Sequence, residues 1–319
     1  MPSDHIDQDA SSERQSMKVS HSGYLRSTYV ALFALYAIII TGSLVRLTGS
    51  GLGCADWPKC SEDKFIDVSS THSAIEQLNR LFTGVVAVAV IVCVLLSIKL
   101  SPRRKDLITM SFVLVVGVLA QVLIGAVVVL TGLNPYSNIA HFLVSIFLMT
   151  VAFMLVKHAR IFRFADEPVP REEPIINNKK ILIVVKLLLS VAGIAVATGT
   201  LVTGSGPHAG DENAVRLGFQ MTTIVRIHST FVWLTVIATI ALAILLRTDL
   251  IAKKMLYQVL RRFSMVIVVQ GVVGYLQYFL GVPIGLVAVH VAVSVLVWLC
   301  ALDIYWNSRL SVMPTNVLD

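Results

Sequence analysis

Charged residues are scarce in this sequence. Charged residues make up 14% of its 319 positions, whereas hydrophobic residues make up 56%. Soluble domains carry about 25% charged residues on average, and they cannot hide so large a share of apolar side chains from water. The composition therefore excludes an ordinary soluble protein and indicates that most of the chain lies in a lipid bilayer.

Runs long enough to cross a membrane are plentiful. A spanning helix needs about 20 predominantly apolar residues, and eight runs satisfy this, near 27–45, 75–98, 108–130, 138–157, 181–202, 223–246, 259–280 and 283–304. The polar leader, 1–23, lacks the apolar core and cleavage site of a signal peptide, so we expect a disordered cytoplasmic tail. The predicted fold class is an all-α integral membrane protein with eight transmembrane helices.

Basic residues gather in alternate loops. They cluster in the tail and in 99–105, 157–180 and 247–262, while the loop 131–137 between them holds none. Because cytoplasmic loops carry such a bias, we expect both termini in the cytoplasm and the protein in the inner (plasma) membrane. The net charge of +7 then reflects topology and contact with anionic lipids, and we expect no nucleic-acid partner.

Cysteine is also scarce, with four in the chain. Cys54 and Cys60 fall in the first external loop, where the compartment is oxidising, so we expect a disulfide between them, with free thiols as the alternative. Two cysteines without a neighbouring pair of histidines supply too few ligands for zinc. Cys93 and Cys300 lie inside apolar runs and are expected to be small core residues.

The second half of the chain echoes the first. The end of the first run, LVRLTGSGLGCAD, resembles the end of the fifth, LVTGSGPHAGD. In 121–141 and again in 270–290, a Gln is followed by Gly at +4, Gly at +11 and His at +20. The shared spacing indicates a duplicated unit of four helices, with both copies in the same orientation.

This repeat predicts the domain organisation. We expect two four-helix bundles joined by a cytoplasmic linker, with a second cytoplasmic tail after the last helix. The expected boundaries are 24–157 for the N-terminal bundle, 158–180 for the linker, 181–306 for the C-terminal bundle and 307–319 for the tail.

Three histidines lie within the apolar runs, at 141, 228 and 290. Ionisable side chains are costly inside a bilayer and often mark function, although any one histidine can also be a hydrogen-bonded core residue. His141 and His290 occupy equivalent repeat positions, and His228 lies on the second helix of its bundle. We therefore expect His228 and His290 to face each other as an axial pair for a haem iron.

The first bundle lacks the counterpart of His228. In its place, the second helix carries Glu76, Asn79 and Arg80, which share one helical face. One interpretation is a structural Glu–Arg pair near the membrane interface. The other is an asymmetric pocket opposite His141, with one axial ligand and a carboxylate near the bound molecule. The second interpretation gives the two bundles different tasks.

These motifs together resemble the haem A synthase family. The string VRLTGSGLGCADWPKC is the most specific mark, joined by the E-x-x-x-R of the second helix and the intramembrane histidines. The resemblance covers about residues 25 to 305. It implies an oxidoreductase that converts a methyl group of haem O to the formyl group of haem A, for use by cytochrome oxidase.

The resemblance also implies roles for individual residues. Haem B is expected between His228 and His290, and haem O in the first bundle with His141 as iron ligand and Glu76 as the catalytic carboxylate. Further expectations are a haem propionate on Arg46, a haem contact from Arg80, and a lid over the pocket mouth closed by a Cys54–Cys60 disulfide. His208 is expected to be either solvated, which we favour, or a propionate ligand.

The chain departs from the family pattern at one position. The family more commonly has His where this chain has Asn79, which favours ligation of the substrate haem by His141 alone. Expected partners are haem O synthase, cytochrome oxidase assembly factors and membrane lipids. The alternative functions are a dihaem b-type electron carrier linked to quinol, which requires histidine pairs in both bundles, and a secondary transporter, which requires interrupted helices.

Overall fold

The structure is a computed structural model that describes residues 20–164, 176–208, 210–211 and 213–309. The described residues form eight long helices and no strand, and each helix is long and apolar enough to cross a membrane. The helices are α2 His21–Leu47, α3 Thr71–Ile98, α4 Lys105–Leu130, α5 Pro135–Phe164, α6 Lys179–Ser205, α7 Met221–Leu245, α8 Leu250–Phe279 and α9 Ile284–Arg309. The predicted fold class is confirmed: this is an all-α, multi-pass membrane protein.

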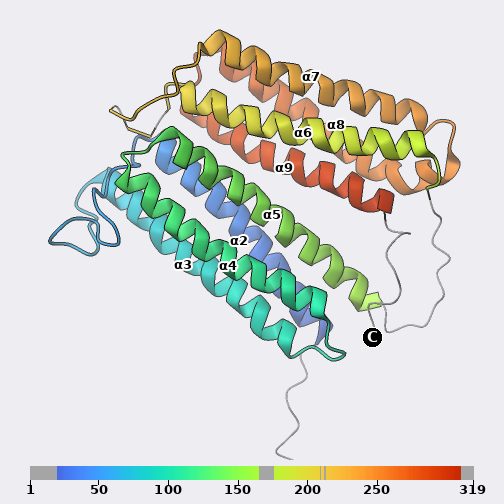
Figure 1. The fold of residues 1–319 in the computed structure, drawn as a ribbon, viewed down its shortest axis with the longest axis horizontal. Helices are drawn as coiled ribbons and strands as arrows, with labels where there is room; N and C mark the ends of the chain where they lie inside the picture. Colours follow the sequence, from blue (N-terminus) through green and yellow to red (C-terminus); the bar gives the residue numbers. More distant parts are fainter. Residues whose placement is uncertain (1–19, 165–175, 209, 212, 310–319) are drawn as a thin grey trace, which may run out of the picture.

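Two groups of helices pack around separate apolar cores. One core is drawn from residues 24–159 together with Val295, and the other from residues 176–304. Figure 1 shows α2–α5 lying together below α6–α9, with α9 next to α2 and α5. This packing is compatible with two four-helix bundles, and the proposed domain boundaries remain predictions.

Helix ends follow local sequence signals. Ser70 caps α3 in a reciprocal capping box with Ser73, and Asp249 caps α8 by accepting from the amide of Ala252. The helix α5 continues to Phe164, so it extends seven residues into the segment expected to be a linker. The rest of that segment lies partly outside the described residues, as do most of the two expected tails.

The two helix groups are joined by polar contacts along a seam. Tyr36 on α2 donates to the carbonyl of Ala292 on α9 at 3.1 Å. The indole of Trp298 on α9 donates to Thr150 on α5 at 2.8 Å. Nearer the opposite end from the loop that holds the cysteines, Lys157 on α5 pairs with Asp303 on α9. These contacts fix one group against the other without using the intramembrane histidines.

Candidate functional site

The rings of His228 and His290 face each other between α7 and α9. Their centroids lie 6.5 Å apart with the planes at 70°. Both histidines lie two turns from the start of their helices, because His228 follows the α7 start at Met221 by seven residues and His290 follows Ile284 by six. The structure thus brings together the two side chains that the repeat predicted as a pair.

Each ring of this pair packs against a glycine on the neighbouring helix. A Cβ at Gly199 would lie 3.3 Å from Cε1 of His228, and a Cβ at Gly274 would lie 3.2 Å from Cε1 of His290. A larger residue at either position would push the ring out of place. The glycines therefore allow close approach of helix and imidazole, which sets the depth of both rings.

The hydrogen bonds of His228 determine which nitrogen is free. Its Nδ1 lies 3.0 Å from the carbonyl of Ala195 and 3.3 Å from Oγ1 of Thr198. Because a carbonyl oxygen only accepts, Nδ1 must carry the hydrogen, which leaves Nε2 with a lone pair for a metal. The Nδ1 of His290 is buried and has no partner among the described residues.

This geometry fits an iron between two imidazoles. Metal–imidazole bonds are about 2 Å long, so two rings on opposite sides of one metal have centroids about 6 Å apart, close to the separation observed. The surroundings are apolar helix faces, and the ring of His228 is oriented by a backbone carbonyl, as metal-bound histidines usually are. The residues present therefore suit a haem with two histidine ligands.

Equivalent contacts recur in the helix group α2–α5. The amide of Gln121 donates to the carbonyl of His141 at 3.0 Å, as Gln270 does to that of His290 at 3.1 Å. A Cβ at Gly125 would lie 3.7 Å from Cε1 of His141. The recurrence is compatible with a duplicated unit, although the duplication itself stays a prediction.

The helix group α2–α5 differs from α6–α9 at the position that corresponds to His228. Thr41 donates to Oδ1 of Asn79 at 2.8 Å, in the place where Thr198 contacts His228 in the second bundle. Asn79 therefore faces its neighbour helix as His228 does, but it presents an amide already hydrogen-bonded to protein. The helix α3 does carry a histidine, His72, but this side chain is exposed. Its Nδ1 is hydrogen-bonded to Oγ of Ser50 at 2.9 Å.

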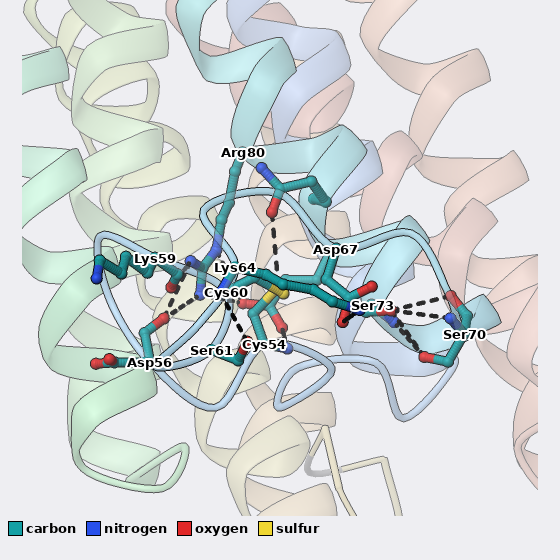
Figure 2. Close-up of a disulfide and its surroundings, with 12 residues drawn as sticks. Cys54, Asp56, Lys59, Cys60, Ser61, Lys64, Asp67, Ser70, Ser73 and Arg80 are labelled. Atoms are coloured by element: carbon teal, nitrogen blue, oxygen red, sulfur yellow. Dashed lines mark hydrogen bonds and ion pairs between the residues drawn. A yellow bond between two sulfur atoms is a disulfide. The ribbon is translucent and has the colours of Figure 1, made fainter.

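The loop between α2 and α3 is closed by a disulfide, as predicted. Cys54 and Cys60 are bonded to each other and are 0% and 3% exposed. Figure 2 shows the disulfide enclosed by the loop, with Ser70 and Ser73 at the start of α3 to one side. Gln77 lies 3.7 Å from the Cys54 sulfur, and this is a packing contact because a disulfide sulfur carries no hydrogen to donate. Cys93 and Cys300 are free, and Cys93 is buried in the first core.

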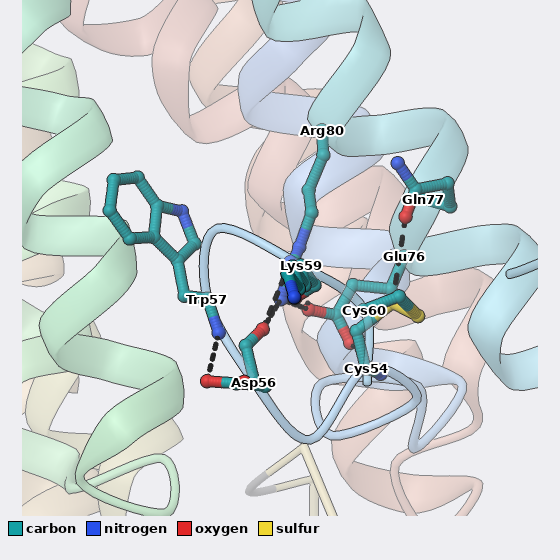
Figure 3. A network of polar contacts seen from close by, with 8 residues as sticks. All are labelled: Cys54, Asp56, Trp57, Lys59, Cys60, Glu76, Gln77 and Arg80. Atoms are coloured by element: carbon teal, nitrogen blue, oxygen red, sulfur yellow. Dashed lines mark hydrogen bonds and ion pairs between the residues drawn. A yellow bond between two sulfur atoms is a disulfide. The ribbon is translucent and has the colours of Figure 1, made fainter. Parts of the chain in front are cut away.

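A polar network holds this loop on α3 (Figure 3). Oε1 of Glu76 accepts from Nη2 of Arg80 at 2.6 Å and from its Nε at 3.0 Å, while Oε2 accepts from the amide of Cys54 at 2.8 Å. Arg80 also donates to the carbonyls of Asp56 and Lys59 at 3.1 and 3.2 Å. Glu76 is 5% exposed, so its charge is neutralised by Arg80 in a mostly buried setting.

This network bears on the roles expected for Glu76 and Arg80. The ion pair that was one interpretation of Glu76 and Arg80 is present. The Arg80 guanidinium is directed to protein acceptors, which favours a positioning role over direct contact with haem. The involvement of Glu76 with the disulfide loop had no signal in the sequence, because 22 residues separate it from Cys54.

Arg46 and His208 lie at the same end of the molecule. Nη2 of Arg46 donates to the carbonyl of Thr203 at 2.7 Å, so an arginine of the first helix group reaches the end of α6. The favoured expectation of a solvated His208 is wrong. Its side chain is partly buried and its Nε2 lies 2.8 Å from the carbonyl of Val282, in the turn between α8 and α9.

Comparison with known proteins places the chain in a family. The model for the COX15-CtaA family, described as a cytochrome oxidase assembly protein, matches residues 26–77 and 63–302. Similar curated proteins are each named "Heme A synthase". The one from Bacillus pumilus is 30% identical over 175 residues, 54% of this chain and 56% of the relative. The one from Geobacillus thermodenitrificans is 29% identical over 137 residues, 42% and 43% of the two chains.

A third such protein, from Lysinibacillus sphaericus, is 30% identical over 139 residues, 43% of this chain and 45% of the relative. The chain thus matches about half the length of these relatives. The family model, however, extends from residue 26 within α2 to residue 302 within α9 and covers every histidine, acidic residue and cysteine of the site. The chain therefore belongs to the COX15-CtaA family of cytochrome oxidase assembly proteins.

Proposed function

We propose that this protein is a haem A synthase, an oxidoreductase that converts a methyl group of haem O to the formyl group of haem A for cytochrome oxidase. The observation that carries the proposal is the contrast between the bundles. One has a facing pair, His228 and His290, and the other has His141 with Asn79 where the second histidine would be. The similarity to proteins named "Heme A synthase" supports it.

In this proposal the second bundle holds haem B between His228 and His290. Conversion of a methyl group to a formyl group removes electrons and protons and adds an oxygen atom, so a redox group is needed, and a bound haem would supply the electron transfer. The carbonyl of Ala195 keeps the Nε2 lone pair of His228 directed away from α6. The glycines behind both rings hold them at one depth. The protein thereby keeps this group fixed.

The first bundle is the proposed substrate site. His141 is the proposed ligand of the haem O iron, and its ring lies against Gly125 on α4. Asn79 is hydrogen-bonded to Thr41, so it offers a weaker interaction than an imidazole on the opposite side. Ligation from one side suits a substrate that must later leave.

Glu76 is the proposed catalytic carboxylate. Its Oε2 bonds the amide of Cys54, so it lies directly beneath the loop that we propose as the lid of the substrate site. We assign to this oxygen the acceptance of protons released as the substrate is oxidised. Arg80 holds the opposite oxygen and two carbonyls of the loop, and thus keeps carboxylate and lid together.

The proposal includes a location and partners. We infer that the helices cross the inner (plasma) membrane with both termini in the cytoplasm, where the basic loops contact anionic lipid headgroups. Haem O synthase is the proposed source of the substrate, and assembly factors of cytochrome oxidase are the proposed recipients of the product.

Extraction of bound pigments tests this proposal against the alternatives. The full chain is co-expressed with a source of haem O, purified, and its haems are extracted and separated. A synthase yields haem B together with haem O or haem A. Haem B alone indicates an electron carrier, and absence of haem indicates a transporter. Either of the last two results overturns the proposal.

A further inference from the structure

A small cavity of about 160 Å³ lies where the two helix groups meet at the end that carries the disulfide loop. Arg46, at the end of α2, lines it from the first group. The connection between α6 and α7 lines it from the second, with His208, Asp211 and Arg216. The cavity is too small for a porphyrin, and its polar lining suits a small charged group.

Arg46 has an unused donor at this cavity. Its Nη2 is bonded to the carbonyl of Thr203, but its Nε is buried and has no partner among the described residues. A buried guanidinium donor without an acceptor destabilises the folded state. Buried polar groups in native proteins are almost always satisfied, so this donor points to a ligand that completes it.

The charges around the cavity favour an anion. Arg46 and Arg216 outnumber Asp211, and neither arginine has an ion pair among the described residues. Arg216 is exposed, lines the cavity and donates from Nη2 to the carbonyl of Pro207 at 3.3 Å. A planar carboxylate matches the fork of a guanidinium.

The backbone of the second group approaches Arg46 closely. Gly210 has φ +111°, and a Cβ there would lie 2.9 Å from Leu133 and 3.4 Å from Cγ of Arg46. The amide of Gly51 donates to the carbonyl of Gly210 at 3.2 Å. These contacts hold the two loops together, so the cavity is built jointly by the two halves of the chain.

The residue that anchors Arg46 lies one helical turn along α6 from the glycine that packs against His228. Thr203, the anchor of Arg46, follows Gly199 by four residues on α6, which is about 6 Å of helical rise. Gly199 is the residue against which the ring of His228 packs. A carboxylate arm on a flat ligand held at His228 can therefore extend to the Arg46 guanidinium.

We propose that Arg46, assisted by Arg216, binds a carboxylate of the haem held between His228 and His290, so that the first bundle completes the haem site of the second. This inference rests on the proposed haem B site. It assigns the anion to the fixed haem rather than to the substrate, and it makes the first half of the chain necessary for tight haem binding by the second.

Titration of the full-length apoprotein with haem B and with its dimethyl ester tests this assignment. The ester has no carboxylates but keeps the iron and ring. For wild type we expect the ester to bind about tenfold more weakly than haem B, the size of a charge-assisted hydrogen bond. Arg46→Gln should weaken haem B about tenfold and leave the ester unchanged, so that discrimination disappears.

Three variants make the result specific. Arg46→Lys keeps the charge and should restore part of the discrimination. Arg216→Gln, on the exposed rim, should fold normally and reduce discrimination about threefold, within the range of an exposed ion pair. Arg247→Gln removes an exposed arginine from the turn after α7, and it should match wild type.

Discrimination that stays at the wild-type level of about tenfold in Arg46→Gln overturns the assignment. If haem B binding is still lost in His228→Ala, the proposed haem site stands and only the carboxylate assignment fails. If wild type binds no haem B, both fail together. Equal binding of haem B and its ester by wild type also overturns the assignment, whatever the variants do.

Discussion

At the scale of single residues, the carboxylate of Glu76 makes two kinds of contact. It neutralises Arg80, and it lies beneath the disulfide loop. Glu76→Gln keeps an oxygen for the Cys54 amide but removes the charge. We expect a folded protein that binds haem and forms haem A at least about 100-fold more slowly, the usual contribution of a general base.

The control for this variant is Glu62→Gln, an exposed acidic residue in the same loop. It should keep wild-type activity by the same assay, haem A formed per mole of protein after co-expression with a haem O source. Wild-type activity in Glu76→Gln would remove this carboxylate from the chemistry and leave it as half of a structural ion pair.

A substitution at Asn79 tests whether the two helix groups differ by one ligand to a haem iron. In Asn79→His, Thr41 can contact the new imidazole as Thr198 contacts His228. We expect a second six-coordinate, low-spin haem, bound between residue 79 and His141, and slower release of substrate. Electron paramagnetic resonance of the purified variant should show two low-spin haems. A spectrum unchanged from wild type would mean that position 79 does not face the bound haem.

Residue-level sequence reasoning found the histidines because an ionisable side chain is conspicuous in an apolar run. It did not find Thr41 or Thr198, because a threonine in a membrane helix can bond its own backbone and carries no distinguishing pattern. It also left His208 as solvated, since its partner is the carbonyl of Val282, 74 residues away.

At the scale of elements, the loop between α2 and α3 is restrained twice, by its disulfide and by Arg80. Arg80→Gln removes the hydrogen bonds to the loop carbonyls and leaves Glu76 buried without its cation. We expect an impermeant phosphine to reduce the Cys54–Cys60 disulfide about tenfold faster than in wild type, because the loop opens more often. Labelling of the two thiols in intact cells measures the rate.

The matched control is again Arg247→Gln, which should be reduced at the wild-type rate. The same labelling tests orientation, since Cys93 and Cys300 should stay unlabelled. Reduction that needs disrupted membranes would reverse the topology, and an unchanged rate in Arg80→Gln would show that the disulfide alone holds the loop.

Helix positions were predictable because a membrane-length apolar run has only one regular solution in lipid, the helix. The disulfide was predictable from the compartment and the short spacing of its cysteines. The docking of the loop on α3 was not predictable, because it depends on hydrogen bonds to the carbonyls of Asp56 and Lys59, which any sequence offers.

At the scale of the whole molecule, the seam between helix groups is stabilised by Asp303. It pairs with Lys157 across the seam and accepts from Asn307 at 2.8 Å. Asp303→Asn leaves Lys157 without its counterion, so we expect a melting temperature several degrees lower, from a loss of roughly 1–3 kcal/mol. Thermal melting in detergent measures this, and the haem spectrum below the transition should match wild type.

A loss of haem in Asp303→Asn at low temperature would contradict the separation of seam and site. The internal echo in the sequence predicted two four-helix units, and the packing is compatible with them. How the units contact each other was not predictable, because Tyr36, Trp298 and Lys157 each contact a residue at least 146 positions away in the sequence.

The most direct test of the account is the low-spin haem spectrum of wild type, His228→Ala, His290→Ala and His141→Ala, purified in parallel. Removal of one axial ligand leaves the iron five-coordinate, so we predict that the low-spin haem B signal is lost or becomes high-spin in His228→Ala and His290→Ala. His141→Ala should keep that signal and bind less haem O. A signal that survives in His290→Ala and disappears in His141→Ala would contradict the account, since it would place the fixed haem in the first bundle.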